Sequence, residues 1–278
     1  MKEINLVITG VSSFVSEPVT IEAWADEFKI PDRNEEGKFL SGGTVEKILG
    51  IKSKSWSPEI FKDPEVVVST ARTAMDRAGV DPVQIDVAII VTCSPFQVQL
   101  DQDAFYLLRN LGLRDNIVPI LLGAGCGGMA RAMALISQME GKKFLILSYS
   151  LSSLYTQTPV YKNNDAHPYG KSLWMSAALF SDGASAVVLQ KTDKPTGFSF
   201  YSRDSLRFGE EEGFHDPLIH YYGSGALVPP GSKDCEALSC FAMSGSKIKE
   251  YYIKGMTLNH EQLLRLQPDY LHIVRKLG

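Results

Sequence analysis

A predicted strand runs through a glycine-rich turn into a predicted helix in the stretch Ile117-Val-Pro-Ile-Leu-Leu-Gly-Ala-Gly-Cys-Gly-Gly-Met-Ala-Arg-Ala-Met-Ala-Leu-Ile-Ser-Gln-Met139. The apolar run 117–122 is long enough for a buried strand, and apolar residues recur at helical spacing from Met129 onward. The turn between them places Cys126 directly before the helix. The stretch therefore predicts a strand–turn–helix unit with a thiol at its apex.

The setting of Cys126 suits a nucleophile. Glycines on both sides permit an unusual backbone conformation and leave room for a substrate to reach the sulfur. A thiol at the N-terminus of a helix also faces the positive end of the helix dipole, which favours the thiolate. A free cysteine is, however, most often a small buried residue, so the turn alone leaves both interpretations open.

A second segment decides between these interpretations. It reads Leu179-Phe-Ser-Asp-Gly-Ala-Ser-Ala-Val-Val-Leu189, with Asp182-Gly183 leading into a Val/Leu strand. Together with Gly125-Cys126-Gly127-Gly128 and the spacing between the two motifs, this segment resembles the condensing enzymes of the thiolase superfamily. The most similar member is β-ketoacyl-acyl carrier protein synthase III. The resemblance covers most of the chain, and the two motifs together are more specific than either one alone.

The resemblance implies an α/β fold of the thiolase-like, layered αβαβα type, made of two similar halves of which the second is incomplete. The first half would span 1–192 and carry the nucleophile, and the second would span 193–278. The implied activity is that of an acyltransferase or condensing enzyme in fatty-acid or polyketide-type biosynthesis. Cys126 would attack an acyl thioester, release coenzyme A and hold the acyl group. Gly125, Gly127 and Gly128 would support the turn, whose backbone N–H groups bind the developing oxyanion.

Substrate-binding positions also follow from the resemblance. The family's region for the nucleotide part of coenzyme A falls on Lys52, Lys54 and Trp56, although a solvated basic loop with one anchoring tryptophan explains them as well. Met175 and Phe180 are expected in the acyl tunnel, although core packing explains them equally well. Acyl-CoA is the expected substrate. No cofactor or metal is expected, because no histidine spacing defines a metal site.

One part of the family's machinery has no counterpart in the chain. The family's histidine, in a motif of the form His-Gln-Ala-Asn, would fall near Val274 or Arg275, where no histidine stands. We expect the sequence to be one part of a longer protein, because a sheet cut off here would leave apolar strands without partners. The alternative is a non-catalytic thiolase-fold subunit that pairs with an active condensing enzyme. The glycine setting of Cys126 argues against that alternative.

Composition and charge exclude several other classes of protein. The chain has 278 residues, of which 44% are hydrophobic and 22% charged, as in ordinary globular proteins. A net charge of −4 gives no argument for nucleic acid or acidic membrane surfaces, and no apolar run approaches a membrane span. We expect a cytoplasmic protein without a signal peptide. From the family we expect a homodimer, with acyl carrier protein as a further partner.

The rest of the chain alternates predicted strands and helices. Strands are predicted over 4–10, 87–91 and 143–148, and helices over 21–28, 44–51, 63–79 and 100–113. This order predicts a sheet with helices on both faces. Cys93, in the loop after the strand 87–91, is expected to be structural, because nothing near it in the sequence prepares a thiolate.

Further strands, a helix and a lid are predicted for the last third of the chain. Strands are expected over 197–203 and 269–274, and a lid over the substrate entrance at 208–240. A helix is expected from Met243 to Leu258, continuing to Leu266. Its buried side would carry Ile248, Tyr251, Tyr252, Ile253 and Met256.

Overall fold

The computed structural model of the chain describes residues 2–3, 5–97, 100–194, 199–200, 219–221, 223–243, 245–269 and 271–272. The chain divides into two compact units. The larger unit comprises Glu3–Asn163 and Trp174–Phe198, and the smaller one comprises Met1–Lys2, Asn164–Leu173 and Ser199–Gly278. The halves 1–192 and 193–278 that the sequence suggests stay a prediction.

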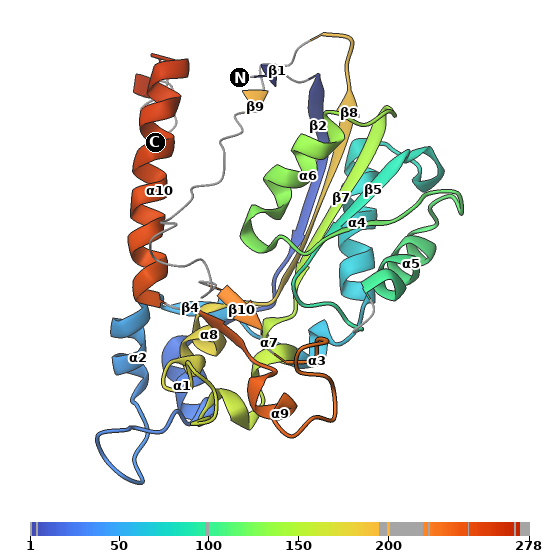
Figure 1. Ribbon diagram of the computed structural model, residues 1–278. Coiled ribbons are helices and arrows are strands. Elements are labelled where there is room, and N and C mark those ends of the chain that lie inside the picture. Colours follow the sequence, from blue (N-terminus) through green and yellow to red (C-terminus); the bar gives the residue numbers. More distant parts are fainter. Residues whose placement is uncertain are drawn as a thin grey trace. The chain divides into compact units, whose positions relative to one another are not determined.

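A mixed sheet of five strands forms the centre of the larger unit (Figure 1). β5 runs parallel to β6 and β7, whereas β8 runs antiparallel to β7 and β2. The predicted strands near 4–10, 87–91 and 143–148 are thereby confirmed. In spatial order the strands are β2 (Leu6–Phe14), β8 (Gly183–Lys191), β7 (Lys143–Ser150), β5 (Val87–Val91) and β6 (Ile120–Leu122).

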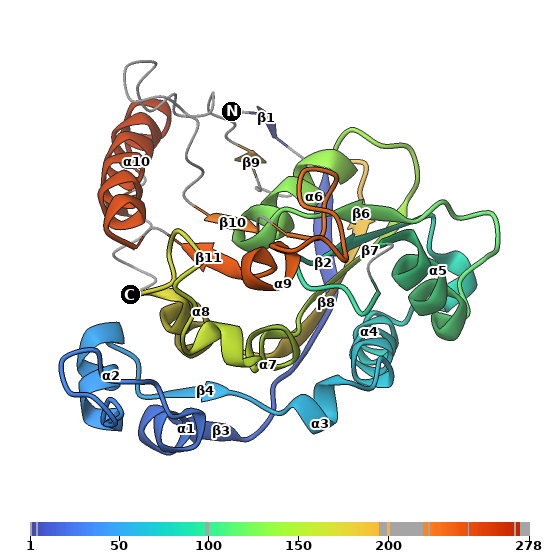
Figure 2. The ribbon, with the colours of Figure 1, turned by 60° about the horizontal axis from the view of Figure 1, so that its bottom comes forward.

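Helices lie on both faces of this sheet, as the alternation of elements predicts (Figures 1 and 2). α4 (Glu65–Ala78) packs on β2 and β8, and α6 (Gly128–Ile136) packs on β5 and β7. Ala88 and Ile90 of β5 join the hydrophobic cluster that includes residues of α4. Because both faces of β5 are covered, the strand is a continuous apolar run.

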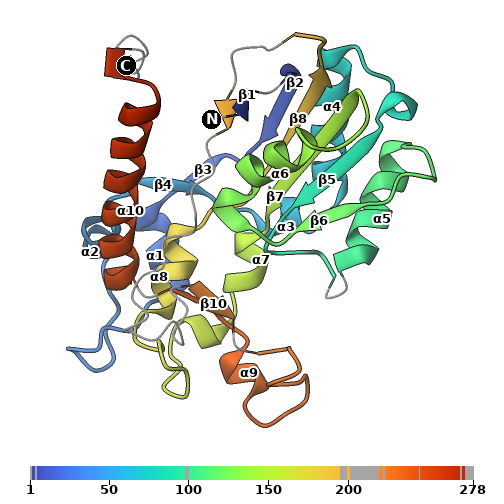
Figure 3. The same cartoon turned by 45° about the horizontal axis from the view of Figure 1, so that its top comes forward.

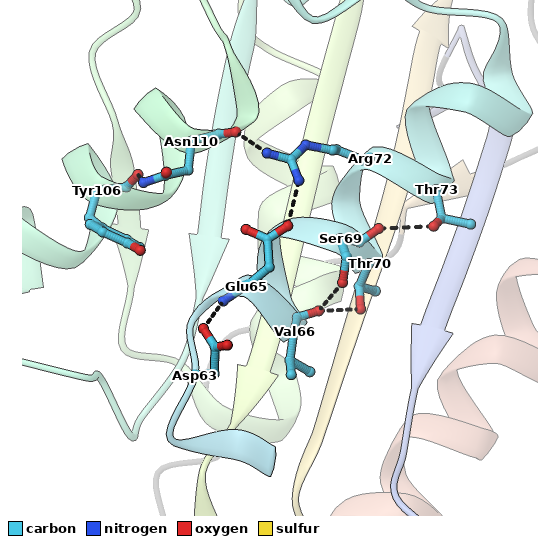
Figure 4. A network of polar contacts seen from close by, with 9 residues as sticks. All are labelled: Asp63, Glu65, Val66, Ser69, Thr70, Arg72, Thr73, Tyr106 and Asn110. Atoms are coloured by element: carbon cyan, nitrogen blue, oxygen red, sulfur yellow. Dashed lines mark hydrogen bonds and ion pairs between the residues drawn. The ribbon is translucent and has the colours of Figure 1, made fainter. Parts of the chain in front are cut away.

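A polar network joins α4 to α5 (Leu100–Leu111) on the exposed side of the two helices (Figure 4). Arg72 donates one hydrogen bond to the Glu65 carboxylate and another to the backbone carbonyl of Asn110. The Asp63 carboxylate accepts the backbone N–H of Glu65 at 2.9 Å, which satisfies a free donor at the start of α4. These contacts fix how α5 lies beside α4, and α5 follows the loop that contains Cys93.

The other elements near the sheet are short. β3 (Pro18–Thr20) pairs antiparallel with β4 (Ser53–Ser55), and the Thr20 hydroxyl caps α1 by accepting the N–H of Ala23. The predicted helices over 21–28 and 44–51 are confirmed as α1 and α2. The remaining helices and turns are α1 (Ile21–Phe28), α2 (Gly42–Leu49), α3 (Pro58–Phe61), η1 (Pro82–Gln84), η2 (Gly125–Gly127), α7 (Ser152–Thr156), η3 (Pro159–Tyr161) and α8 (Leu173–Leu179).

The smaller unit contains one long helix, α10 (Gly245–Leu266), which Figure 3 shows as an extended rod. β10 (Ile219–Tyr221) pairs antiparallel with β11 (Phe241–Met243), and α9 (Cys235–Leu238) lies between them in sequence. The predicted burial of Tyr252, Ile253 and Met256 is wrong, because these side chains are 66%, 57% and 56% exposed. Helical spacing shows that a face is apolar, but burial also requires a partner layer.

Two further predictions fail or fall outside the description. The strand predicted over 269–274 is wrong at Leu271 and His272, which are helical and exposed, because a short apolar run does not distinguish the two structures. Of the strand predicted over 197–203, the structure describes only Ser199–Phe200, which form β9. The short strand near the start of the chain, β1, is Lys2–Glu3. The predicted lid at 208–240 lies outside the described residues at 208–218 and 222. None of the described helices is long and apolar enough to cross a membrane.

Candidate active site

Cys126 lies at the edge of the sheet where the parallel strands end, in the turn between β6 and α6. The turn residues form η2, and α6 begins at Gly128, two residues after the thiol. The Cys126 side chain is exposed, as a thiol that meets a substrate must be. At this position the sulfur stands beside the positive end of the α6 dipole.

Each position of the turn favours glycine for a different geometric reason. Gly125 has a φ of 49°, in the left-handed region that favours glycine. A β-carbon at Gly128 would lie 2.1 Å from Cγ1 of Val91, so α6 can begin this close to β5 only without a side chain there. A β-carbon at Gly127 would find its nearest atom, Nε of Arg131, at 3.9 Å. Gly125 and Gly128 therefore shape the backbone, whereas Gly127 leaves space beside Cys126.

A second exposed thiol, that of Cys93, lies next to this turn. A β-carbon at Gly125 would lie 3.5 Å from Sγ of Cys93. The two segments meet because β5 and β6 are parallel neighbours, with Val91 opposite Leu122, and both end at the same edge of the sheet. The expectation that Cys93 is only structural rested on its sequence neighbours, which say nothing about the strand that lies beside it.

The loop after β5 is held on both sides of Cys93. The backbone N–H of Thr92 donates to the carbonyl of Leu122 at 3.3 Å, which extends the pairing of β5 with β6. The Thr92 hydroxyl donates to the carbonyl of Tyr149 at 2.9 Å. The Ser94 hydroxyl accepts the N–H of Leu151 at 2.8 Å. The backbone around Cys93 is thus fixed while its side chain faces solvent.

A buried carboxyl group completes the support of this loop. Asp103 of α5 is 2% exposed and accepts hydrogen bonds from the Phe96 backbone N–H and from the Tyr149 hydroxyl. Burial raises the pKa of Asp103, although these hydrogen bonds act in the opposite direction. Burial and the neighbouring Asp103 also raise the pKa of Tyr149. Asp103 did not emerge from the sequence, because Tyr149 lies on a strand that is distant from α5 in the chain.

Lys54 lies in a different environment, between two tryptophan rings. Its Nζ is 4.0 Å from the ring centroid of Trp24 and 3.6 Å from that of Trp56, and it donates to the carbonyl of Ala177 in α8. The side chain is almost fully buried. Burial lowers the pKa of Lys54 to about 6, and the Asp182 carboxylate acts in the opposite direction. In this structure the amine is therefore engaged with the protein itself.

Asp182 fixes the segments around Lys54. Its carboxylate accepts the backbone N–H of Ser57 at 2.8 Å and that of Ser153 at 2.7 Å. Its own N–H donates to the carbonyl of Ser55 at 3.0 Å. With 1% of its surface exposed, Asp182 joins β4, the start of α7 and the start of β8. In the second sequence motif, Asp182 thus stabilises the packing of neighbouring segments.

The predicted site residues fall into separate groups. Gly125, Cys126, Gly127 and Gly128 form one turn, as predicted from the sequence. Lys54 and Trp56 form the aromatic cluster, whereas the neighbouring Lys52 is exposed. Met175 in α8 and Phe180 just after it are half-buried. The roles of these residues in binding coenzyme A or an acyl chain stay predictions. Among the described residues, no three His, Cys, Asp or Glu side chains are grouped to hold a metal ion.

The chain has a thiolase-like fold. A solved structure described as a 3-oxoacyl-(acyl-carrier-protein) synthase III superposes on the chain with a TM-score of 0.70 at 17% sequence identity. The superposition covers 94% of this chain and 74% of that one. The α/β fold class that the two motifs predict is thereby confirmed.

Sequence relatives narrow the class further. The β-ketoacyl-[acyl-carrier-protein] synthase III of Neisseria meningitidis serogroup C is 29% identical over 150 residues, which cover 52% of this chain and 42% of that protein. The enzyme of the same name from Coxiella burnetii is 28% identical over 191 residues, covering 68% of this chain and 53% of that protein. The predicted resemblance to β-ketoacyl-acyl carrier protein synthase III is confirmed, and the matched part spans about half the length of these relatives. No model of a known protein family matches the chain.

Proposed function

We propose that the protein is an acyltransferase of the condensing-enzyme type, in which Cys126 takes an acyl group from acyl-CoA or from acyl carrier protein. The observation that carries this proposal is the exposed Cys126 thiol in a glycine turn directly before α6, in a thiolase-like fold. The names of the relatives support the same class of reaction. The product would serve fatty-acid or polyketide-type biosynthesis.

The first step is a thioester exchange at Cys126. The sulfur attacks the carbonyl carbon of the acyl thioester, and the carbonyl oxygen becomes an oxyanion. The tetrahedral intermediate then collapses, the coenzyme A thiol leaves with the proton that Cys126 gives up, and the acyl group stays on the protein. The first N–H groups of a helix have no acceptor within the helix, so the start of α6 is suited to stabilise the oxyanion.

The second step would transfer the acyl group to a carbon or another nucleophile. In a condensation, the carbanion formed by decarboxylation of a malonyl thioester attacks the acyl carbon, and the Cys126 thiolate leaves. Carbon dioxide is the other product. This step belongs to the proposal through the resemblance, since the family's histidine motif has no counterpart in the chain.

The proposal includes a cytoplasmic homodimer. β6 is the last strand on its side of the described sheet, and Val118 just before it is 77% exposed. Phe105 and Tyr106 on α5 are also exposed. Exposed apolar side chains beside an edge strand support a second copy as the partner, because edge strands otherwise invite uncontrolled pairing.

Intact mass spectrometry tests the first step. The protein is incubated with a panel of acyl-CoA thioesters of increasing chain length, beside the variants Cys126→Ala and Cys93→Ala. We expect one acyl group on the wild type and on Cys93→Ala, and none on Cys126→Ala. The acyl chain lengths that react show which substrates the site accepts. If no thioester acylates the wild type, the proposal fails and the alternative of a non-catalytic thiolase-fold subunit takes its place.

A further inference from the structure

Two exposed thiols stand at one edge of the sheet. Cys93 follows β5 and Cys126 follows β6, and the sulfur of Cys93 lies 3.5 Å from the β-carbon position of Gly125, the residue directly before Cys126. Since successive Cα atoms are about 3.8 Å apart, the Cα of Cys126 lies within about 9 Å of that sulfur. Rotation of both side chains between their staggered rotamers shortens the separation of the two sulfurs.

The surroundings of the pair favour a reaction between the two thiols. Both side chains are exposed, so a soluble reagent can reach them. Thr92 and Ser94 hold the backbone on either side of Cys93, and Gly128 seats the start of α6 directly against Val91. The two segments are therefore held next to each other while the side chains keep their rotamer freedom. A disulfide forms only where the two Cα atoms approach to about 4.4–6.8 Å, so its formation in solution measures that approach.

We propose that Cys93 and Cys126 form a vicinal dithiol that closes reversibly to a disulfide. With a small-molecule disulfide as oxidant, one cysteine thiolate attacks a sulfur of the reagent and releases one thiol. The second cysteine then attacks the mixed disulfide and releases the other thiol. The protein loses two hydrogens in total, and the reagent is reduced to two thiols.

Closure of this disulfide has a consequence for the proposed function. It consumes the Cys126 sulfur, so an oxidised protein takes no acyl group until a reductant reopens the bond. Transient disulfides of this kind are the ones found in reducing compartments. This consequence rests on the proposed role of Cys126, whereas the dithiol itself rests only on the geometry of the two turns.

The chain supplies a matched control in its other two cysteines. Cys235 and Cys240 are buried, in contrast to the exposed pair. Cys240 donates to the carbonyl of Ala237, and burial raises its pKa to about 11. The double variant Cys235→Ser/Cys240→Ser removes both buried thiols and leaves the proposed dithiol intact.

Oxidation of the folded protein with oxidised glutathione tests the proposal. After blocking of the remaining thiols, intact mass and a non-reducing peptide map locate each sulfur. We expect the wild type and Cys235→Ser/Cys240→Ser to lose two hydrogens, with the peptides of Cys93 and Cys126 linked and released again by dithiothreitol. Cys93→Ser and Cys126→Ser should each retain a glutathione adduct on the remaining thiol. Glutathione on both thiols of the wild type, without a link, would overturn the proposal.

A trivalent arsenical gives a second measurement that requires less exact geometry. Phenylarsine oxide bridges two neighbouring thiols and releases one water. We expect one bridged adduct on the wild type and none that survives washing on Cys93→Ser or Cys126→Ser. If the dithiol forms but the reduced protein takes no acyl group, only the proposed function fails. If acylation occurs but neither the disulfide nor the arsenical bridge forms, this inference fails.

Discussion

The Lys54–Asp182 cluster and the Cys126 turn both contain residues that the sequence marks, but the structure treats them in opposite ways. Lys54 is buried against two indole rings, and Asp182 accepts two backbone N–H groups. Cys126 stands exposed at the edge of the sheet. Buried polar groups must be bonded within the protein, whereas an exposed thiol is free to meet another molecule.

We therefore expect the Lys54–Asp182 cluster to determine the stability of the larger unit, and the Cys126 turn to determine its reactivity. Substitutions in the Lys54–Asp182 cluster should change the free energy of unfolding. Substitutions of Cys126 should abolish acylation and leave that free energy nearly unchanged, since exposed positions rarely matter by more than about 0.5 kcal/mol. The three tryptophans, Trp24, Trp56 and Trp174, all lie in the larger unit, so their fluorescence in urea reports its unfolding.

Asp182→Ala should produce the largest loss of stability. It leaves the N–H groups of Ser57 and Ser153 without their acceptor and takes away the carboxylate beside Lys54. Each buried N–H donor left unpaired costs about 1–3 kcal/mol, so we expect a loss of about 3–5 kcal/mol. Tryptophan fluorescence in urea measures the loss.

Asp86→Ala is the matched control for this prediction. Asp86 also accepts two backbone N–H groups, those of Lys142 and Lys143, but it is partly exposed and faces Arg114 at 3.3 Å. Water can replace the carboxylate there, so we expect a loss of about 1–2 kcal/mol. Equal losses for the two variants would show that burial does not distinguish Asp182.

Lys54→Met should change the pH dependence of stability. Burial lowers the pKa of Lys54 to about 6 in the folded protein, against about 10.4 for an unperturbed lysine. Between these values the unfolded chain binds a proton that the folded protein does not, so stability rises with pH by up to about 1.4 kcal/mol per unit. Below about pH 6 both states hold the proton, and this dependence disappears.

Urea titrations at pH 6.5 and 8.5 measure this effect. We expect the wild type to gain up to about 2.5 kcal/mol relative to Lys54→Met between the two pH values. Lys52→Met serves as the control, because Lys52 is exposed and its charge stays in water. The same pH dependence in the wild type and Lys54→Met would mean that the folded protein holds Lys54 charged.

Gly128→Ala should lower the free energy of unfolding by less than Asp182→Ala does. Its β-carbon would lie 2.1 Å from Cγ1 of Val91, and overpacking of this kind costs about 1–3 kcal/mol. The variant should also move α6 and weaken acylation of Cys126. Gly127→Ala, whose β-carbon has room, should keep the stability of the wild type. Rescue of Gly128→Ala by Val91→Ala would identify this contact as the cause, and failure of the rescue would reject it.

The sequence by itself determined the local elements and the class of fold. Apolar runs located β5 and β7, Thr20 marked the start of α1, and the glycines around Cys126 marked the turn before α6. These features are set by backbone sterics, capping and hydrophobic spacing within a few residues of each other. The pairing of the two motifs then indicated the thiolase-like fold, which the superposition confirms.

Tertiary structure alone decided which distant residues meet and which faces are covered. Cys93 lies beside the Cys126 turn because β5 and β6 are parallel neighbours, although the two cysteines are 33 positions apart in the sequence. Lys54 is buried because Trp24 and α8 close over it, and Tyr252 of α10 is exposed although its spacing predicts burial. Burial and proximity depend on packing between segments that are far apart in the chain, and a local sequence pattern does not contain that information.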